Sequence, residues 1–189
     1  MLARPSNIEI NNRLVGFGMS NVSENNWEAV MVTILHYLSI RMDYNQTLQK
    51  ATRLIVDETQ VVSEKPGSIK QLNDAVITFR KFGGIVTMAM QNISKVLANQ
   101  KLMEIYQNCS YKCFFTQDGV DAQSLASVQP LSAKDYHMLT SGKEGEGIIV
   151  WDKKVIPFSA RIEKDNPLYE PYNTNFHEKA KRKEEQIRM

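Results

Sequence analysis

The chain has 189 residues, enough for one domain with a sizeable core, and its share of hydrophobic (42%) and charged (23%) residues is typical of a globular protein. A formal net charge of +2 gives no direct sign of a nucleic-acid partner. The first residues lack the apolar stretch of a signal peptide, and no apolar run approaches the roughly 20 residues that span a bilayer. These features predict a cytoplasmic location. Cys109 and Cys113 offer too few ligands for structural zinc and are expected to be buried thiols.

Hydrophobic periodicity predicts strands and helices that alternate along the chain. We expect strands at residues 13–19, 53–58, 85–91 and 110–117, and helices at 23–42, 65–84, 93–109, 121–128 and 132–141. An antiparallel hairpin is predicted at residues 145–162, with its turn at Asp152 and Lys153. The second and third strands are apolar on both faces, which favours a mostly parallel sheet with helices on both faces. The predicted fold class is therefore α/β, with right-handed crossovers.

Two adjacent acids, Asp57 and Glu58, end the apolar stretch "RLIVDE". Ligands of open α/β sheets bind beyond the carboxyl ends of the strands. An apolar strand that ends in Asp-Glu has the Walker B form, in which Asp57 would hold Mg²⁺ through water and Glu58 would polarise the attacking water. The alternative is that the acids cap the next element, and the pattern by itself does not decide between them.

Gln91 is predicted to end the following apolar strand, "IVTMAMQ". An amide at this position suits a group that senses a γ-phosphate or the attacking water, and the alternative is a loop cap. Together the two strand ends favour the functional interpretation.

Arg80 and Lys81 end the helix between these strands. One of them is a candidate arginine-finger-like cation for a neighbouring subunit's nucleotide site. Cations at a helix C-terminus are also favoured by the helix dipole, so ordinary surface charge is an equal alternative.

The phosphate-binding sequence G-x-x-x-x-G-K-[ST] occurs nowhere in the chain. Without a loop that cradles phosphates, the two acids have no nucleotide to act on. We therefore expect the chain alone to be inactive as an ATPase.

The blocks "RLIVDETQVV", "AVITFRKFGGIVTMAMQNISKVL", "IYQNCSYKCFF" and "LSAKDYHMLTSGKEGEGIIVWDKKVIPF", in this order, resemble the carboxy-terminal half of the conjugative-transfer ATPases of type IV secretion systems. The resemblance extends over about residues 13–174. It implies a partial RecA-like domain at residues 13–165 that lacks the P-loop segment, after a lead-in at 1–12 and before a polar, charged tail at 166–189.

The resemblance also implies functions and partners. Asp57 and Glu58 match the family's Walker B acids, Gln91 matches the glutamine after the next strand, and Arg80 and Lys81 match its basic pair. Where many members have Thr-Gln, this chain has Met90 before Gln91. The implied cofactors are Mg²⁺ and ATP. The implied partners are sister subunits in a hexamer and secretion-channel proteins at the inner membrane, where the protein would be peripheral.

Two other functions stay open. One is a non-catalytic assembly module that binds channel proteins or sister subunits through its surfaces. The other is a DNA-pumping translocase of the coupling type, which the modest charge does not favour.

Overall fold

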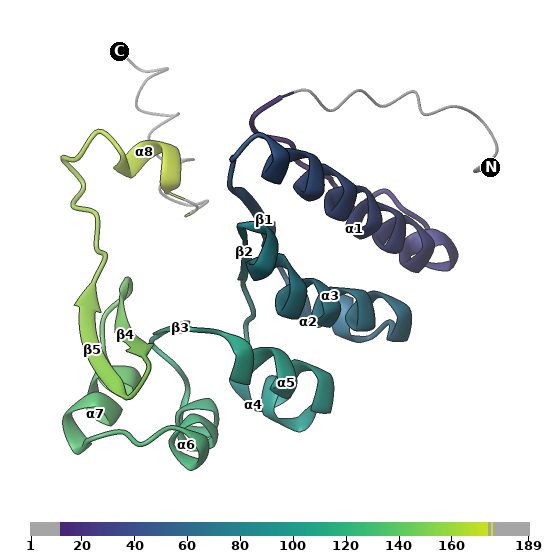
Figure 1. Ribbon diagram of the computed structural model, residues 1–189. Helices are drawn as coiled ribbons and strands as arrows, with labels where there is room; N and C mark the ends of the chain where they lie inside the picture. Colours follow the sequence, from purple (N-terminus) through teal and green to yellow (C-terminus); the bar gives the residue numbers. More distant parts are fainter. Residues whose placement is uncertain (1–11, 174, 176–189) are drawn as a thin grey trace. The chain divides into compact units, whose positions relative to one another are not determined.

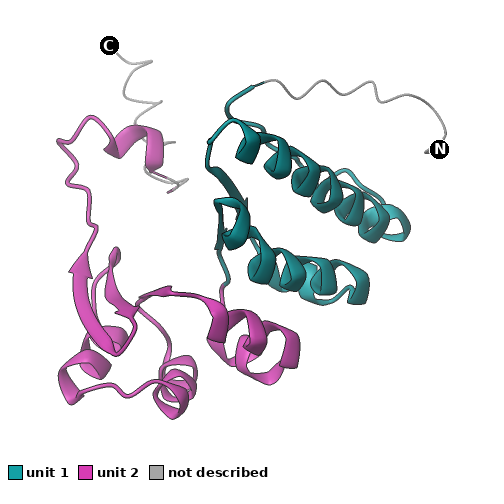
Figure 2. Ribbon diagram, viewed as in Figure 1, with its two compact units in different colours: residues 1–90 teal, residues 91–189 magenta. Residues whose placement is uncertain are grey.

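The computed structural model describes residues 12–173 and residue 175 (Figure 1). These residues form two compact units, which divide between Met90 and Gln91 (Figure 2). Within this described part, no helix is both long and apolar enough to cross a membrane. Most of the predicted polar tail, residues 176–189, lies outside the described residues.

A pair of parallel strands and four helical segments make up the first unit. In chain order these are α1 (Glu24–Thr47), β1 (Thr52–Val56), α2 (Thr59–Ser63), α3 (Pro66–Thr78), the 3₁₀ helix η1 (Phe79–Phe82) and β2 (Gly84–Met88). The register of the two strands runs from Thr52 opposite Gly84 to Val56 opposite Met88. The prediction that these strands are parallel neighbours is therefore confirmed.

The core of the first unit packs on one face of this sheet. Met42 of α1, Ala75 of α3 and Phe79 of η1 are buried together, and Leu54 and Val86 of the two strands pack against them. Gly84 begins β2 in close contact with this cluster, where an added Cβ would lie 2.8 Å from the Cβ of Phe79. Glycine at the start of β2 therefore lets the strand approach η1 closely. Gly83 ends η1 with a φ of +71°, as expected of a C-terminal glycine.

The prediction of a strand at residues 13–19 is wrong. The described part of this segment has no regular secondary structure, and Leu14 is exposed. A strand needs a neighbour to pair its backbone groups, and Gly16 and Gly18 weaken the preference for an extended chain. Apolar residues alone were not sufficient evidence for a strand here.

The second unit is built around an antiparallel sheet. Its elements are α4 (Ile93–Ala98), α5 (Gln100–Asn108), β3 (Tyr111–Phe115), α6 (Gly119–Val128), α7 (Ala133–Ser141), β4 (Glu146–Trp151), β5 (Lys154–Ser159) and α8 (Tyr169–Tyr172). The strand order is β3-β4-β5, with both pairs antiparallel. The predicted hairpin is confirmed, and Asp152 occupies its turn with a φ of +55°. Ser132 is the N-cap of α7, where its hydroxyl and Asp135 form a reciprocal capping box.

The predicted order of alternating strands and helices implied that β3 continues the parallel sheet. This is wrong, because β3 belongs to the separate antiparallel sheet. Its side chains alternate between exposed and buried, a pattern typical of antiparallel sheets with one covered face. On the buried side, Phe114, Ile148 and Val150 belong to the core. On the other side, Tyr111 stacks on Trp151 with ring centroids 5.7 Å apart. Cys113 is exposed, so the expectation of a buried thiol is wrong for this residue.

Candidate catalytic site at the end of the parallel strands

Asp57 and Glu58 follow β1 directly, at the carboxyl end of the parallel strand pair. The loop that carries them is fixed to the residue after β2. The Thr59 amide donates to the Ala89 carbonyl at 3.0 Å, and the Ala89 amide donates to the Val56 carbonyl at 2.9 Å. The position of the two acids is therefore set by the pairing of the strands rather than by a free loop.

Thr59 is a structural part of this site that the sequence analysis did not identify. The residue is fully buried, and its hydroxyl donates to the Val56 carbonyl at 3.2 Å. Its position directly after the acid pair was the available signal. Together with its amide bond to Ala89, this contact holds the turn from β1 into α2.

Glu58 adopts the left-handed backbone conformation, with φ +48° and ψ +46°. This conformation costs a non-glycine residue about 1–2 kcal/mol. Such strained residues are concentrated at functional sites, where the surrounding structure holds them in place. In the described structure, the hydrogen bonds of Thr59 and Ala89 on either side of the turn supply that support.

The side chains of both acids are exposed. One Asp57 oxygen, Oδ1, accepts the amide of Glu58 at 2.9 Å. Although Glu58 occupies the N-cap position of α2, its side chain does not cap the helix, and no residue that the structure describes binds its carboxylate. Asp57 therefore makes a local contact of the capping kind, to the Glu58 amide, whereas the Glu58 side chain makes none. Both carboxylates face solvent, and the backbone of Glu58 is left-handed rather than helical.

Asp57 offers a single exposed carboxylate, so a metal held there would have to complete its shell with waters and ligand oxygens. Among residues 12–173 and 175, no three His, Cys, Asp or Glu side chains gather into a metal-binding group. Mg²⁺ commonly takes one or two carboxylates and completes its shell with waters and substrate phosphates. Asp57 could hold Mg²⁺ in this way, and the metal would then neutralise charge on a bound phosphate.

Arg80 and Lys81 lie at the opposite end of the sheet. Both are exposed residues of η1, which precedes the amino end of β2, whereas the acids follow the carboxyl end of β1. A strand of five residues separates the two ends by about 16 Å. The structure therefore does not bring the basic pair to the acids of the same chain, and a role in catalysis would require the site of another subunit.

The prediction that Gln91 is the last residue of a strand is wrong. β2 ends at Met88, and Gln91 is the exposed first residue of the second unit. The segment after it is anchored by Asp121, which is buried near the start of α6. Its carboxylate accepts the Ser94 amide at 2.9 Å and the Asn92 side-chain amide at 3.3 Å. The proximity of Gln91 to the acids stays a prediction.

Asp121 should make the second unit sensitive to acid. Burial opposes ionisation of its carboxyl, but hydrogen bonds from Ser94 and Asn92 outweigh burial and lower its pKa below the ordinary value. A lowered pKa stabilises the folded state above the unfolded-state pKa of about 3.9, and this contribution is lost as the pH falls through the folded pKa. We expect Asp121→Asn to be less stable than the wild type at pH 7 and to lose less stability below pH 4.

The measurement is the midpoint of urea unfolding as a function of pH. Unfolding is monitored by the fluorescence of Trp151 in a Trp27→Phe background. Trp151 lies in the second unit and Trp27 in the first, so this background reports the correct unit. Asp165→Asn, which changes an exposed acid, is the control and should keep the wild-type slope. Parallel pH profiles for the wild type and Asp121→Asn would contradict the prediction.

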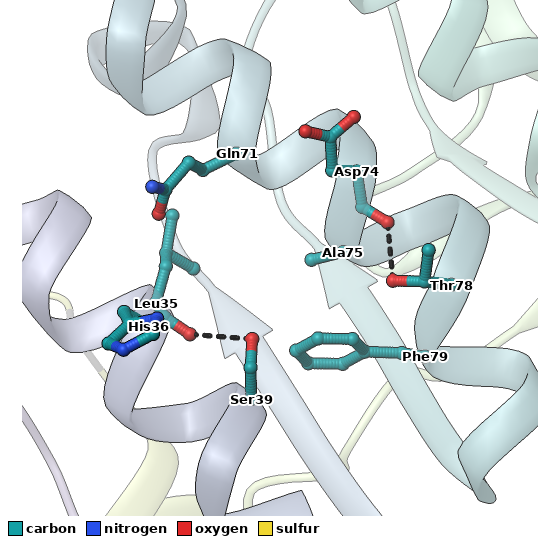
Figure 3. A pocket seen from close by; sticks show the side chains of 8 residues that line it. All are labelled: Leu35, His36, Ser39, Gln71, Asp74, Ala75, Thr78 and Phe79. Atoms are coloured by element: carbon teal, nitrogen blue, oxygen red, sulfur yellow. Dashed lines mark hydrogen bonds between the residues drawn. The ribbon is translucent and has the colours of Figure 1, made fainter.

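A cavity of about 200 Å³ lies elsewhere in the first unit, between α1 and the α3–η1 segment (Figure 3). Its lining residues are Leu35, His36, Ser39, Gln71, Asp74, Ala75, Thr78 and Phe79. The hydroxyls of Ser39 and Thr78 already donate within their own helices, to the carbonyls of Leu35 and Asp74. Neither Asp57 nor Glu58 lines the cavity, so it is separate from the candidate site.

The fold is similar to that of a solved structure, VirB4 of Thermoanaerobacter pseudethanolicus, with a TM-score of 0.64 and 22% sequence identity. The match covers 77% of this chain and 40% of that chain. No protein-family model and no curated protein sequence matches the chain.

This similarity confirms the predicted α/β fold and shows that the chain shares it with VirB4. The chain spans less than half the length of VirB4.

Proposed function

We propose that this chain is the carboxy-terminal part of an ATPase of a type IV secretion or conjugative DNA-transfer system. The observation that carries the proposal is the acid pair Asp57-Glu58 at the carboxyl end of a parallel strand, in a fold similar to VirB4. The left-handed backbone of Glu58 and its unpartnered carboxylate within the described chain support a catalytic role over a capping role.

In the complete enzyme, Asp57 would hold the Mg²⁺ of Mg-ATP through water. Glu58 would accept a proton from the water that attacks the γ-phosphate, while the metal neutralises charge on the phosphate oxygens. Gln91 would sense the γ-phosphate or orient that water. Each of these groups must come close to the same phosphate, so the proposal requires Gln91 to approach the end of β1 in the assembled enzyme.

Arg80 or Lys81 would act in the nucleotide site of a sister subunit, because η1 lies at the other end of the strands from the acids of its own chain. A ring of subunits, a hexamer in the family that the sequence resembles, would bring one subunit's η1 to the next subunit's site. The enzyme would work in the cytoplasm, at the inner face of the membrane, on channel proteins.

The isolated chain should not hydrolyse ATP at a measurable rate, because its sequence contains no P-loop. The measurement is phosphate release from Mg-ATP by the purified chain, with and without the polypeptide that supplies the P-loop. We expect turnover only when both are present. Robust turnover by the chain alone, abolished by Glu58→Gln, would contradict the proposal that the P-loop comes from outside this sequence.

The second candidate is a non-catalytic assembly module, favoured by the absence of a P-loop sequence and by apolar residues on the surface of the first unit. It predicts that Asp57→Ala and Glu58→Ala leave DNA transfer intact in cells. Loss of transfer in both variants, with the protein present at normal amounts, would argue for the ATPase. Hydrolysis that DNA stimulates and salt strongly weakens would instead indicate a DNA-pumping translocase.

A further inference from the structure

Gln91 follows closely on a residue that the strand pairing fixes in place. The Ala89 amide donates to the Val56 carbonyl at 2.9 Å, and the Ala89 carbonyl accepts the Thr59 amide at 3.0 Å. Thr59 directly follows Glu58, so Ala89 is tied to the turn that carries the acid pair. Consecutive Cα atoms lie about 3.8 Å apart, so the Cα of Gln91 stays within about 7.6 Å of the Cα of Ala89.

The chain directly after Gln91 is held by a buried carboxylate. One oxygen of Asp121, Oδ1, accepts the Ser94 amide at 2.9 Å, and the other, Oδ2, accepts the side-chain amide of Asn92 at 3.3 Å. Asp121 is only 4% exposed, so water competes little for these two bonds. Hydrogen bonds to a charged group are stronger than those between neutral groups. The start of α4, two residues after Gln91, is therefore tied to α6.

Asp121 is itself fixed by the packing of α6. Its backbone amide donates to Oδ1 of Asp118, the N-cap residue of α6, at 2.8 Å. The same helix carries Ala122 and Leu125, which are fully buried, and α6 packs against α4. Because Asp121 belongs to a packed helix, the position of its carboxylate is set by the core of the second unit.

Asn92 shows that this contact takes the place of an ordinary helix cap. It occupies the N-cap position of α4, where an asparagine side chain commonly accepts an amide of its own helix. Here the side chain makes no such bond and donates to Asp121 instead. The exposed Gln91 thus lies between two anchors, Ala89 and Asn92, that are three residues apart.

We propose that Asp121 is a positioning residue for Gln91, a role that rests on the proposed function of Gln91 at the γ-phosphate. By holding the start of α4, Asp121 would fix the path of the chain at Gln91, and so the place where its amide meets the phosphate or the attacking water. Reacting groups need this precision, because a displacement of about 1 Å can cost about 100-fold in rate. Asp121 itself would touch neither the nucleotide nor the water.

A purely structural Asp121 predicts a different outcome. Its loss would then lower the amount of folded protein but not the rate per folded molecule. Any loss of rate would also be the same whether or not residue 91 is glutamine. A positioning Asp121 acts only through Gln91, so the effects of the two substitutions on turnover should not add.

The first measurement is phosphate release by the full chain assembled with its P-loop polypeptide, over a range of Mg-ATP concentrations. Asp121→Asn should lower kcat by about 10–100-fold with little change in KM, because the new amide sets a donor against the donor of Asn92. Rates are expressed per folded molecule, as measured by circular dichroism. Asp135→Asn is the matched control, since it breaks the capping box of α7 in the same unit and should leave kcat unchanged. An unchanged kcat in Asp121→Asn would overturn the inference.

Two double variants make the test specific. In a Gln91→Ala background, Asp121→Asn should cause no further loss of kcat. Asp121→Asn combined with Asn92→Asp exchanges donor and acceptor across the 3.3 Å contact and should recover most of the lost kcat. Equal losses with and without Gln91 would overturn the inference, as would a folded exchange variant that recovers no turnover.

Hydrogen exchange tests the anchor without relying on catalysis. Asp121→Asn should speed exchange of the Ser94 amide more than Asp135→Asn does, and equal rates would overturn the inference. Normal turnover in Gln91→Ala would also overturn it, while leaving the assignment of Glu58 intact. Normal turnover in Glu58→Gln, with the expected loss in Asp121→Asn, would contradict the general-base proposal alone.

Discussion

Replacing Glu58 with glutamine is expected to lower the rate of ATP hydrolysis by about 10²–10⁴-fold in the enzyme assembled with its P-loop polypeptide, the usual contribution of a general base. The amide keeps the size and shape of the side chain but cannot take a proton from the attacking water. The measurement is steady-state phosphate release at saturating Mg-ATP. Affinity for the nucleotide should change little, because Glu58 is assigned to the water and not to the phosphates.

Glu64→Gln is the matched control. Glu64 is an exposed acid in the same unit, at the C-cap of α2, and its replacement should leave turnover unchanged. Glu58→Gly adds a second comparison, because glycine adopts the left-handed conformation at little cost. This variant should be inactive without being less stable than Glu58→Ala. Equal turnover for wild type and Glu58→Gln would exclude Glu58 as the base.

Truncating Phe79 to alanine is expected to destabilise the first unit by about 3–5 kcal/mol, as for other buried aromatic residues. Phe79 is 2% exposed and packs with Met42 and Ala75 at the sheet. The truncation would leave a cavity where α1, α3 and β2 meet. A loss of this size is comparable to the whole stability of many domains, about 5–15 kcal/mol, so the unit should be close to unfolding.

The measurement is urea unfolding followed by the fluorescence of Trp27 in a Trp151→Phe background, which reports the first unit. Ile77→Ala, two residues earlier on the exposed side of α3, is the control and should change stability by less than about 0.5 kcal/mol. Similar losses in the two variants would show that the cluster around Phe79 is not the core of this unit.

Local sequence pattern was sufficient where the physical cause is itself local. The helix that begins after Ser23, the helix that begins after Ser132 and the hairpin turn at Asp152 depend on residues close together in the chain. The sequence also predicted that Asp57 and Glu58 lie at the end of a strand. The change from apolar to acidic residues after Val56 indicates where β1 ends. The α/β class follows from the same periodicity.

Which distant segments pair with one another could be seen only in the tertiary structure. The apolar residues at 13–19 pair with no strand in the part of the chain that the structure describes, and β3 pairs with β4 in a separate antiparallel sheet. Gln91 lies beyond the end of β2 because the strand stops where its register with β1 ends, at Met88. Backbone hydrogen bonds between strands depend on which segments meet, and side-chain type alone does not specify this.

The sequence by itself determined the chemistry that is available: two carboxylates at a strand end, a basic pair before the next strand, and no P-loop. Only the tertiary structure decided their arrangement. It placed Arg80 and Lys81 at the opposite end of the sheet from the acids, held Glu58 in a left-handed turn through Thr59, and exposed Ile55 and Ile85 on one face of the parallel strand pair. The physical reason is that strand direction, register and burial arise from contacts between residues far apart in the chain, which local periodicity does not encode.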